Sequence, residues 1–280
     1  MEETVDVLIT LQFTQEMFEK LGNISPRLKV KIIRTFRFED IPPETWATVS
    51  ILYTDRLLPS PEQAPNLKWI QFHWAGINHA LEAPILQRPG LQVTTLSGVA
   101  ASKVAEFTVM MLLALGMRMT EIVQWQRKGE WPGDRWERFK PLELRDSTVG
   151  IIGYGSIGRK IAYLLQPFGA RILAAKRDAM QTEDAGYVPK GSGDPGGDLA
   201  WRIYPSEALC TMVKECDFVV VTLPLTSKTR GLVNADVFSA MKPSAYLVDV
   251  SRGGVVDQIA LIDGLKDHKI AGAALDVFNK

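Results

Sequence analysis

The sequence is poor in cysteine and histidine, has no excess of either charge, and lacks a long apolar run. Its two cysteines are spaced C-x5-C, which is not a zinc-ligand spacing and provides no disulfide framework. Thirty-two basic residues balance thirty-two acidic ones, which argues against a general nucleic-acid or anionic-membrane binder. The longest apolar run, VMMLLALGM, is about half a membrane span, and the N-terminal MEETVDVLIT has no signal region. We therefore predict a cytoplasmic protein with reduced thiols, no metal site, and neither a nucleic-acid nor a membrane partner.

The chain has the length and balance of a globular protein with two domains: 280 residues, 46% of them hydrophobic and 23% charged. In the first hundred residues, short β-branched or aromatic runs alternate with helical or proline-rich segments. This alternation predicts a small parallel sheet with covered faces. The predicted strands are Val5–Thr10, Val30–Ile33, Val49–Tyr53, Leu67–Phe72 and Val93–Thr95, with a helix over Thr14–Leu21.

The longest predicted helix covers Ser102–Met119, where apolar residues recur at helical spacing. The next segment, Glu121–Leu144, loses this periodicity and carries three tryptophans among charged residues. Strand and helix patterns then alternate to the end, interrupted by a polar, glycine-rich loop over Asp178–Asp198. The predicted strands are Thr148–Ile152, Arg171–Ala175, Phe218–Thr222, Ala245–Val250 and Ile270–Leu275, and the helices are Ser156–Leu165, Ala235–Met241 and Gln258–Lys266.

A glycine-rich turn joins the strand Thr148–Ile152 to the helix that follows it. The turn reads Gly153-Tyr154-Gly155-Ser156-Ile157-Gly158, the G-x-G-x-x-G pattern of dinucleotide-binding folds. The first glycine allows the tight turn, the second lets a pyrophosphate approach the backbone, and the third lets helix and strand pack closely. The phosphates would lie over free N–H groups at the positive end of the helix. The pattern predicts a cofactor site, with a glycine-rich turn that binds nothing as the alternative.

The residues at the end of the second strand indicate which cofactor is bound. An acid that accepts from the ribose 2′-hydroxyl is expected about twenty residues after the turn. Lys176 and Arg177 stand there instead, and two cations suit a 2′-phosphate. The sequence therefore favours NADP over NAD. The alternative is that both cations are solvated and Asp178 takes the ribose.

Several separate motifs between about Leu67 and the last residue resemble the D-isomer-specific 2-hydroxyacid dehydrogenases. They are FHWAGINH, VAEFTVMMLLAL, GIIGYGSIG, FVVVTLPLTSKTRGLV, LVDVSRGGVVDQIALIDGL and AGAALDVF. The resemblance implies hydride transfer between a nicotinamide cofactor and a small 2-hydroxy or 2-keto acid. It also implies an α/β fold: a Rossmann doubly wound parallel sheet over residues 97–280, which binds the dinucleotide, and a smaller flavodoxin-like α/β domain over 1–96, which binds substrate.

The resemblance carries further site residues onto this sequence. The family's substrate loop falls on Ala75 and Gly76, whose N–H groups would bind the substrate carboxylate, because a glycine-containing turn aims consecutive donors at an anion. The other implied cofactor contacts are Leu223, Pro224 and Thr229 at the adenine end, and Val250 and Asp276 at the nicotinamide end.

Arg252 is the predicted catalytic residue. It lies just past an apolar strand, where open α/β sheets place ligands, and it matches the family's catalytic arginine. A guanidinium can bind the substrate carboxylate bidentately and stabilise the alkoxide of hydride transfer. A salt bridge at a strand end is the alternative for this residue.

Two catalytic residues of the family, a Glu and a His, would fall beyond Lys280. Because a hydride transfer to a ketone needs a proton donor, we expect a chain ending at Lys280 to bind cofactor better than it turns over substrate, and we assign the activity to a longer parent protein. The alternatives are a cofactor-sensing binding protein, similar to the C-terminal-binding-protein corepressors, and a catalytically incomplete dinucleotide-binding scaffold. The apolar surface of Ser102–Met119 and Glu121–Leu144, together with the resemblance, predicts a homodimer.

Overall fold

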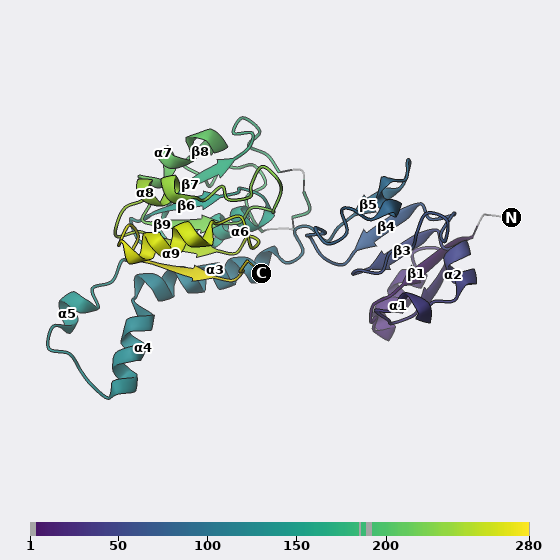
Figure 1. The fold of residues 1–280 in the computed structure, drawn as a ribbon, viewed down its shortest axis with the longest axis horizontal. Helices are drawn as coiled ribbons and strands as arrows, with labels where there is room; N and C mark the ends of the chain where they lie inside the picture. Colours follow the sequence, from purple (N-terminus) through teal and green to yellow (C-terminus); the bar gives the residue numbers. More distant parts are fainter. Residues whose placement is uncertain (1–3, 185, 189–191, 280) are drawn as a thin grey trace. The chain divides into compact units, whose positions relative to one another are not determined.

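The computed structural model describes residues 4–184, 186–188 and 192–279, and these form two parallel β-sheets, one in each of two units (Figure 1). Unit 1 is Met1–Ser97 and unit 2 is Gly98–Lys280.

Unit 1 contains a five-stranded parallel sheet in the order β2-β1-β3-β4-β5. This is the flavodoxin-like order, in which β2 lies on one side of β1 and the later strands β3, β4 and β5 are added on the other side. The strands are β1 (Val5–Ile9), β2 (Leu28–Ile32), β3 (Ile51–Thr54), β4 (Trp69–Phe72) and β5 (Gln92–Thr94). The helical elements are α1 (Gln15–Gly22), α2 (Pro43–Thr48) and the short 3₁₀ turns η1 (Phe38–Asp40) and η2 (Pro84–Gln87).

The core of unit 1 lies on the face of the sheet that α2 covers. Leu52 and Ile70, from the middle strands, are fully buried there, and Trp46 of α2 is 2% exposed. Phe38 stacks on Trp46 with ring centroids 5.0 Å apart. The alternating burial of β3 and β4 reflects the period of two that a strand imposes on its side chains.

Unit 2 contains a six-stranded parallel sheet in the order β11-β10-β9-β6-β7-β8, the Rossmann order. The strands are β6 (Thr148–Ile152), β7 (Arg171–Lys176), β8 (Arg202–Pro205), β9 (Phe218–Val221), β10 (Tyr246–Asp249) and β11 (Gly272–Leu275). The helices are α3 (Ala101–Gly116), α4 (Met119–Lys128), α5 (Arg135–Arg138), α6 (Ser156–Leu165), α7 (Leu209–Val213), α8 (Ala235–Ala240) and α9 (Gln258–Lys266), with 3₁₀ turns η3 (Gln166–Phe168) and η4 (Ser206–Ala208).

Helices cover both faces of this sheet. Side chains of α3 and α6 form one core with one face, and those of α7, α8 and α9 form a second core with the other. The central strands β6, β9 and β10 are buried along their whole length. A parallel sheet buried on both faces reads as continuous apolar runs, which is why these strands were visible in the sequence. The predicted fold class is confirmed.

Two parts of unit 2 differ from the sequence prediction. The helix predicted over Ser102–Met119 ends at Gly116, because Arg118 takes the left-handed conformation (φ 51°) and starts a new helix. The prediction that Glu121–Leu144 is aperiodic is wrong for its first part, which belongs to α4. This helix has no buried residue, and its apolar face, Met119, Ile122 and Val123, covers little more than one turn, so it was not recognised among the charged residues that follow. In Figure 1, α4 and α5 extend away from the sheet of unit 2.

Short elements were also missed. Strand β8 and helix α2, of four and six residues, each include a proline, which marks turns more often than regular structure. The described residues of the loop over 178–198 contain no helix or strand, as predicted. None of the helices in the described part of the chain is long and apolar enough to span a bilayer.

Candidate functional site

The glycine turn lies between β6 and α6, at the point where the strand order of unit 2 reverses. Strand β6 pairs with β7 on one side and β9 on the other, so the carboxyl end of β6 faces the crevice in which such sheets bind ligands. Gly153 has a φ of 103°, which side-chain-bearing residues rarely adopt. A Cβ at Gly158 would collide with the carbonyl oxygen of Gly153, so only glycine allows helix and turn to approach this closely.

Gly155 has a different environment. A Cβ there would have no atom within 4 Å, so nothing in the described protein requires a glycine at this position. The residue is exposed and caps the N-terminus of α6, whose first N–H groups have no intrahelical acceptor. The open space over Gly155 is therefore where an anionic ligand could approach the positive end of the helix.

A cavity of about 400 Å³ lies at this turn and brings together seven of the predicted cofactor residues. They are Gly153, Tyr154, Gly155, Lys176, Arg177, Leu223 and Pro224. Ser156, Ile157 and Gly158 follow in the first turn of α6. The rest of the wall was not predicted from the sequence: it consists of Arg159 of α6, Thr222 after β9, and Gln181, Glu183, Asp184 and Gly186 of the 178–198 loop.

The basic pair at the end of β7 has two different environments. The Lys176 ammonium donates to the carbonyl oxygen of Gln181, and burial, followed by the nearby Arg159 charge, lowers the pKa of Lys176. Arg177 is exposed at the cavity. The Asp178 carboxylate accepts from the N–H of Met180 at 3.1 Å, so it stabilises its own turn.

Thr229 does not line this cavity. Its hydroxyl donates to the carbonyl oxygen of Pro224 at 2.6 Å and accepts from the N–H of Thr226 at 2.8 Å. These bonds close the turn that follows β9. Within the described structure, Thr229 therefore fixes the shape of the loop that carries Leu223 and Pro224.

Arg252, Val250 and Asp276 lie at the carboxyl ends of β10 and β11. Val250 is 4% exposed, whereas Arg252 and Asp276 are exposed. The Arg252 guanidinium donates to the carbonyl oxygen of Ser251 at 2.7 Å. The N–H of Asp276 donates to the carbonyl oxygen of Asp249 at 2.9 Å, which joins the two strand ends.

Ala75 and Gly76 lie in unit 1, directly after β4. Ala75 is exposed and Gly76 is half-buried. His73, two residues before Ala75, is held by a 2.6 Å hydrogen bond between its Nδ1 and the hydroxyl of Tyr53. Burial raises the pKa of this tyrosine, so its hydroxyl keeps its proton at neutral pH. The predicted carboxylate loop is thus an accessible turn at the carboxyl end of a parallel strand.

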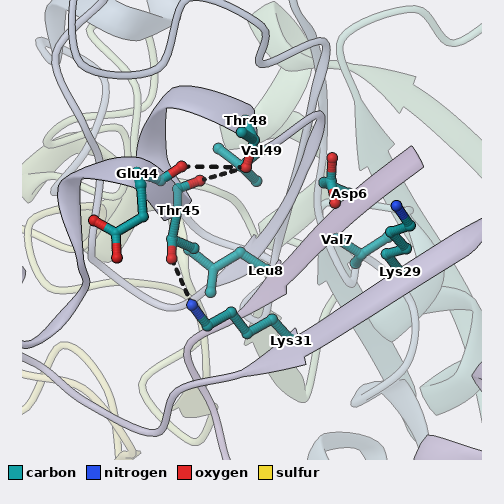
Figure 2. Close-up of a pocket in the computed structure, with 9 residues that line it drawn as sticks. All are labelled: Asp6, Val7, Leu8, Lys29, Lys31, Glu44, Thr45, Thr48 and Val49. Carbon is teal, nitrogen blue, oxygen red and sulfur yellow. Dashed lines mark hydrogen bonds between the residues drawn. The ribbon is translucent and has the colours of Figure 1, made fainter. Parts of the chain in front are cut away.

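A second cavity, of about 280 Å³, lies in unit 1 between β1, β2 and α2 (Figure 2). Lys29 and Lys31 project into it from β2, and the Lys31 ammonium donates to the Thr45 hydroxyl at 2.6 Å. Asp6 and Glu44 line the same cavity, so cations and carboxylates balance there. It includes none of the predicted site residues. Among the described residues, no cluster of three or more His, Cys, Asp or Glu side chains could hold a metal ion.

The fold and the glycine turn define a dinucleotide-binding α/β protein, and comparison with known proteins gives its family. Residues 109–280 match the family described as "D-isomer specific 2-hydroxyacid dehydrogenase, NAD binding domain", and the chain belongs to this family of oxidoreductases. It is 33% identical over 258 residues to a glyoxylate reductase of Thermofilum pendens, covering 91% of this chain and 69% of that protein. The chain spans 62% to 69% of the length of the glyoxylate reductases it matches.

Two solved structures show the same fold with different nicotinamide cofactors. The D-lactate dehydrogenase of Aquifex aeolicus, complexed with NAD and lactic acid, has a TM-score of 0.70 at 25% identity, over 98% of this chain and 77% of that one. A D-isomer specific 2-hydroxyacid dehydrogenase of Xanthobacter autotrophicus, in complex with NADPH and MES, has a TM-score of 0.73 at 27% identity, over 99% and 82%. The unit 2 fold is therefore that of a domain that binds NAD or NADP.

Asp249 was not singled out in the sequence, although it ends β10 three residues before Arg252. Its side chain is buried at 3% exposure and accepts at one oxygen from the N–H (3.0 Å) and the hydroxyl (2.5 Å) of Ser251. Burial raises the pKa of Asp249, the two bonds from Ser251 oppose this, and the charge of Asp276 adds to it.

The raised pKa predicts how Asp249→Asn changes stability with pH. The free energy of unfolding of the wild type has its full value below the pKa of Asp249 in the unfolded chain, about 3.9. It falls as pH rises through the pKa of the folded state, because burial opposes the charge on Asp249. The asparagine keeps an oxygen for Ser251 and has no charge. Thermal unfolding across this range should show the variant gaining stability relative to wild type as pH rises. Asp263→Asn, an exposed carboxylate of α9, is the control; a pH-independent difference for Asp249→Asn would contradict the assignment.

Proposed function

We propose that the protein transfers a hydride between NADP(H) or NAD(H) and a small 2-hydroxy or 2-keto acid. The open space over Gly155 carries this proposal. Gly153 and Gly158 are explained by backbone geometry and packing, but only a ligand explains the absence of a side chain at Gly155. A pyrophosphate over the N-terminus of α6 fits that space, and the adjoining cavity takes the adenosine. Family membership supports the same reaction.

We propose that NADP is preferred, through Arg177 and Lys176. The exposed Arg177 guanidinium presents a planar set of donors that matches a phosphate. Lys176 uses one of its three N–H donors on Gln181 and keeps two for the cofactor. Two cations where an NAD-binding protein has a carboxylate remove the repulsion of a 2′-phosphate. We assign Leu223 and Pro224 to the adenine end, with Thr229 shaping their loop, and Val250 and Asp276 to the nicotinamide end.

The proposed roles of the two units follow from where their residues lie. Residues 97–280 bind the dinucleotide, and residues 1–96 bind the substrate carboxylate through the N–H groups of Ala75 and Gly76. The bound nicotinamide supplies or accepts the hydride. Arg252 donates hydrogen bonds to the substrate, and its fixed positive charge stabilises the oxygen that becomes an alkoxide during hydride transfer. In the direction of reduction this oxygen then takes a proton from a general acid, a role that the family resemblance places outside residues 1–280.

The Arg252 assignment predicts a loss of turnover without a loss of cofactor binding. Arg252→Gln should lower kcat/KM for glyoxylate reduction by NADPH about 10²- to 10³-fold, the cost of removing a transition-state donor. The dissociation constant of NADPH should stay within about twofold, since Arg252 is assigned to substrate. Nicotinamide absorbance gives the rate and fluorescence quenching the affinity.

Arg145→Gln is the matched control, because Arg145 is exposed before the amino end of β6, away from the carboxyl ends of the strands. It should behave as wild type. Undiminished turnover in Arg252→Gln would refute the role of this residue. If the wild type oxidised neither NADPH nor NADH with any short 2-keto acid as substrate, the proposed reaction would be refuted.

The cofactor preference is tested by removing each cation separately. Arg177→Ala should weaken NADPH binding about tenfold or more while NADH binding changes little, because one charge-assisted bond contributes about 1.5–3 kcal/mol. Lys176→Asp combined with Arg177→Ala should reverse the preference. Arg171→Ala, at the opposite end of β7, is the control. Equal affinity of wild type for NADPH and NADH would show that the pair is surface charge only.

We propose that the protein is a homodimer formed through α3, α4 and α5. Exposed apolar side chains gather on these elements and on the segment between α4 and α5: Met110 is 51% exposed, Met119 44%, Trp131 74% and Trp136 78%. Together they exceed the scattered apolar residues of an ordinary surface.

In sedimentation at micromolar concentration, the wild type should have the mass of a dimer. The double variant Met110→Glu, Met119→Glu should have the mass of a monomer, because dimerisation would bury its two carboxylates in the interface without partners. Ile259→Glu, at a 74% exposed position on α9, should remain dimeric. A monomeric wild type would contradict the proposal.

A further inference from the structure

Arg159 is a buried cation in the first turn of α6. It directly follows Gly158 and is only 1% exposed, although arginine is almost never fully buried without partners. Its ring contact is with Tyr154, whose ring centre lies 4.8 Å from the guanidinium carbon. The function proposed above assigns no role to this side chain, so its burial needs another explanation.

The guanidinium binds three carbonyl oxygens from three places in the chain. Its Nε donates to Tyr154 in the glycine turn at 3.2 Å, one terminal nitrogen donates to Asp194, and the other donates to Thr182. The carboxylate of Asp184 lies 3.6 Å from Nε and balances the charge. One side chain thus ties both ends of the segment between Thr182 and Asp194 to the glycine turn.

Further bonds hold the same segment closed. The Tyr154 hydroxyl donates to the buried Asp194 carboxylate at 2.7 Å, and that carboxylate also accepts from the N–H of Asp198 at 2.9 Å. The N–H of Asp184 donates to the carbonyl oxygen of Pro195 at 2.9 Å, which joins the two ends of the segment directly. Burial, followed by the hydrogen bond to Asp194, raises the pKa of Tyr154, so its hydroxyl keeps its proton.

The segment held in this way forms one wall of the cofactor cavity. Gln181, Glu183 and Asp184 line the same cavity as Lys176 and Arg177. This is the end of the second strand, where dinucleotide-binding folds place the adenosine ribose. The described residues of this segment form no helix or strand, so side-chain bonds fix their position. Lys176 holds Gln181 and Lys160 holds Ser192 at 2.7 Å, while Arg159 and Tyr154 together hold both Thr182 and Asp194.

We propose that Arg159 is a positioning residue for the adenosine half of the cofactor, which it serves by fixing residues 181–184 and 194–198 of the loop against the glycine turn. The inference rests on the proposed function, because it requires that the cavity binds a dinucleotide. Arg159 borders the same cavity, but its side chain is only 1% exposed and its donors are used on the carbonyl oxygens of Tyr154, Thr182 and Asp194. It raises affinity by keeping the wall in its binding-competent position.

The fork geometry of arginine is needed for this role. Three carbonyl oxygens around one planar group require donors spread over a rigid plane, and a lysine ammonium at the end of a flexible chain presents a single point. Arg159→Lys keeps the charge and loses the fork, whereas Arg159→Met loses both. Tyr154→Phe removes only the hydroxyl bond to Asp194 and leaves no buried charge unpaired at residue 159.

The experiment measures how these variants bind two halves of the cofactor. The probes are NADPH, adenosine 2′,5′-bisphosphate for the adenosine half and nicotinamide mononucleotide for the other half. If the variants leave the wall in position about one-tenth of the time, the dissociation constants of NADPH and the adenosine bisphosphate rise about tenfold in Arg159→Lys and Arg159→Met. The constant for nicotinamide mononucleotide should stay within about twofold. Tyr154→Phe should show the same pattern with a smaller rise.

Limited proteolysis should then cut within residues 178–198 more readily in the Arg159 variants than in wild type. Arg171→Met, which removes an exposed arginine of β7 paired with Glu215, is the control and should match wild type in both measurements. A purely structural role would lower thermal stability and leave the adenosine affinity of the folded variants unchanged. That result would overturn the inference, as would an equal loss of affinity for both halves.

The wild-type measurements separate this inference from the proposed function. If wild type binds neither NADPH nor NADH, both fail together. If wild type binds a dinucleotide and Arg159→Lys and Tyr154→Phe bind adenosine bisphosphate equally well, only the role of Arg159 is refuted. These two variants keep the test decisive even where Arg159→Met does not fold.

Discussion

The close approach of α6 to the glycine turn is the constraint on which the rest of unit 2 depends. The backbone of Gly158 lies so near the carbonyl oxygen of Gly153 that no side chain fits between them. This contact brings the N-terminus of α6 to the carboxyl end of β6, which lies between β7 and β9 at the point where the strand order reverses. The positive helix end and the crevice of the sheet therefore coincide, and this coincidence is what makes the turn an anion site.

The same contact explains why a cation is buried beside the turn. Arg159 follows Gly158 on α6, so its side chain leaves the helix where the turn and the 178–198 loop meet. A buried guanidinium is costly unless its N–H donors and its charge find partners. Here three carbonyl oxygens and the Asp184 carboxylate supply them. The arrangement ties described residues of a loop without regular structure to the glycine turn.

Sequence patterns predicted those features that depend on neighbouring residues. The apolar runs of β6, β9 and β10, the glycine turn and the strand alternation all have local signatures, and the observed strand orders confirm the predicted fold class. Helix α4 was not recognised because its apolar face, Met119, Ile122 and Val123, covers little more than one turn. Arg159 could not be assigned because its acceptors lie 23 and 35 residues away, in a loop recognisable only as glycine-rich. The only local signal for a special role of Arg159 was its position directly after Gly158, on the buried face of α6.

The charges around the cofactor cavity also change how the basic pair is understood. In the sequence, Lys176 and Arg177 are equivalent cations at the end of a strand. In the structure, Lys176 is bonded to Gln181 in the same loop that Arg159 holds, while Arg177 is exposed. Glu183 and Asp184 line the cavity as well, and Asp184 is balanced by Arg159. Because the buried Arg159 balances the charge of Asp184, that carboxylate opposes an anionic cofactor less than its place in the cavity wall suggests. The positive charge that Lys176 and Arg177 offer a phosphate therefore depends in part on Arg159.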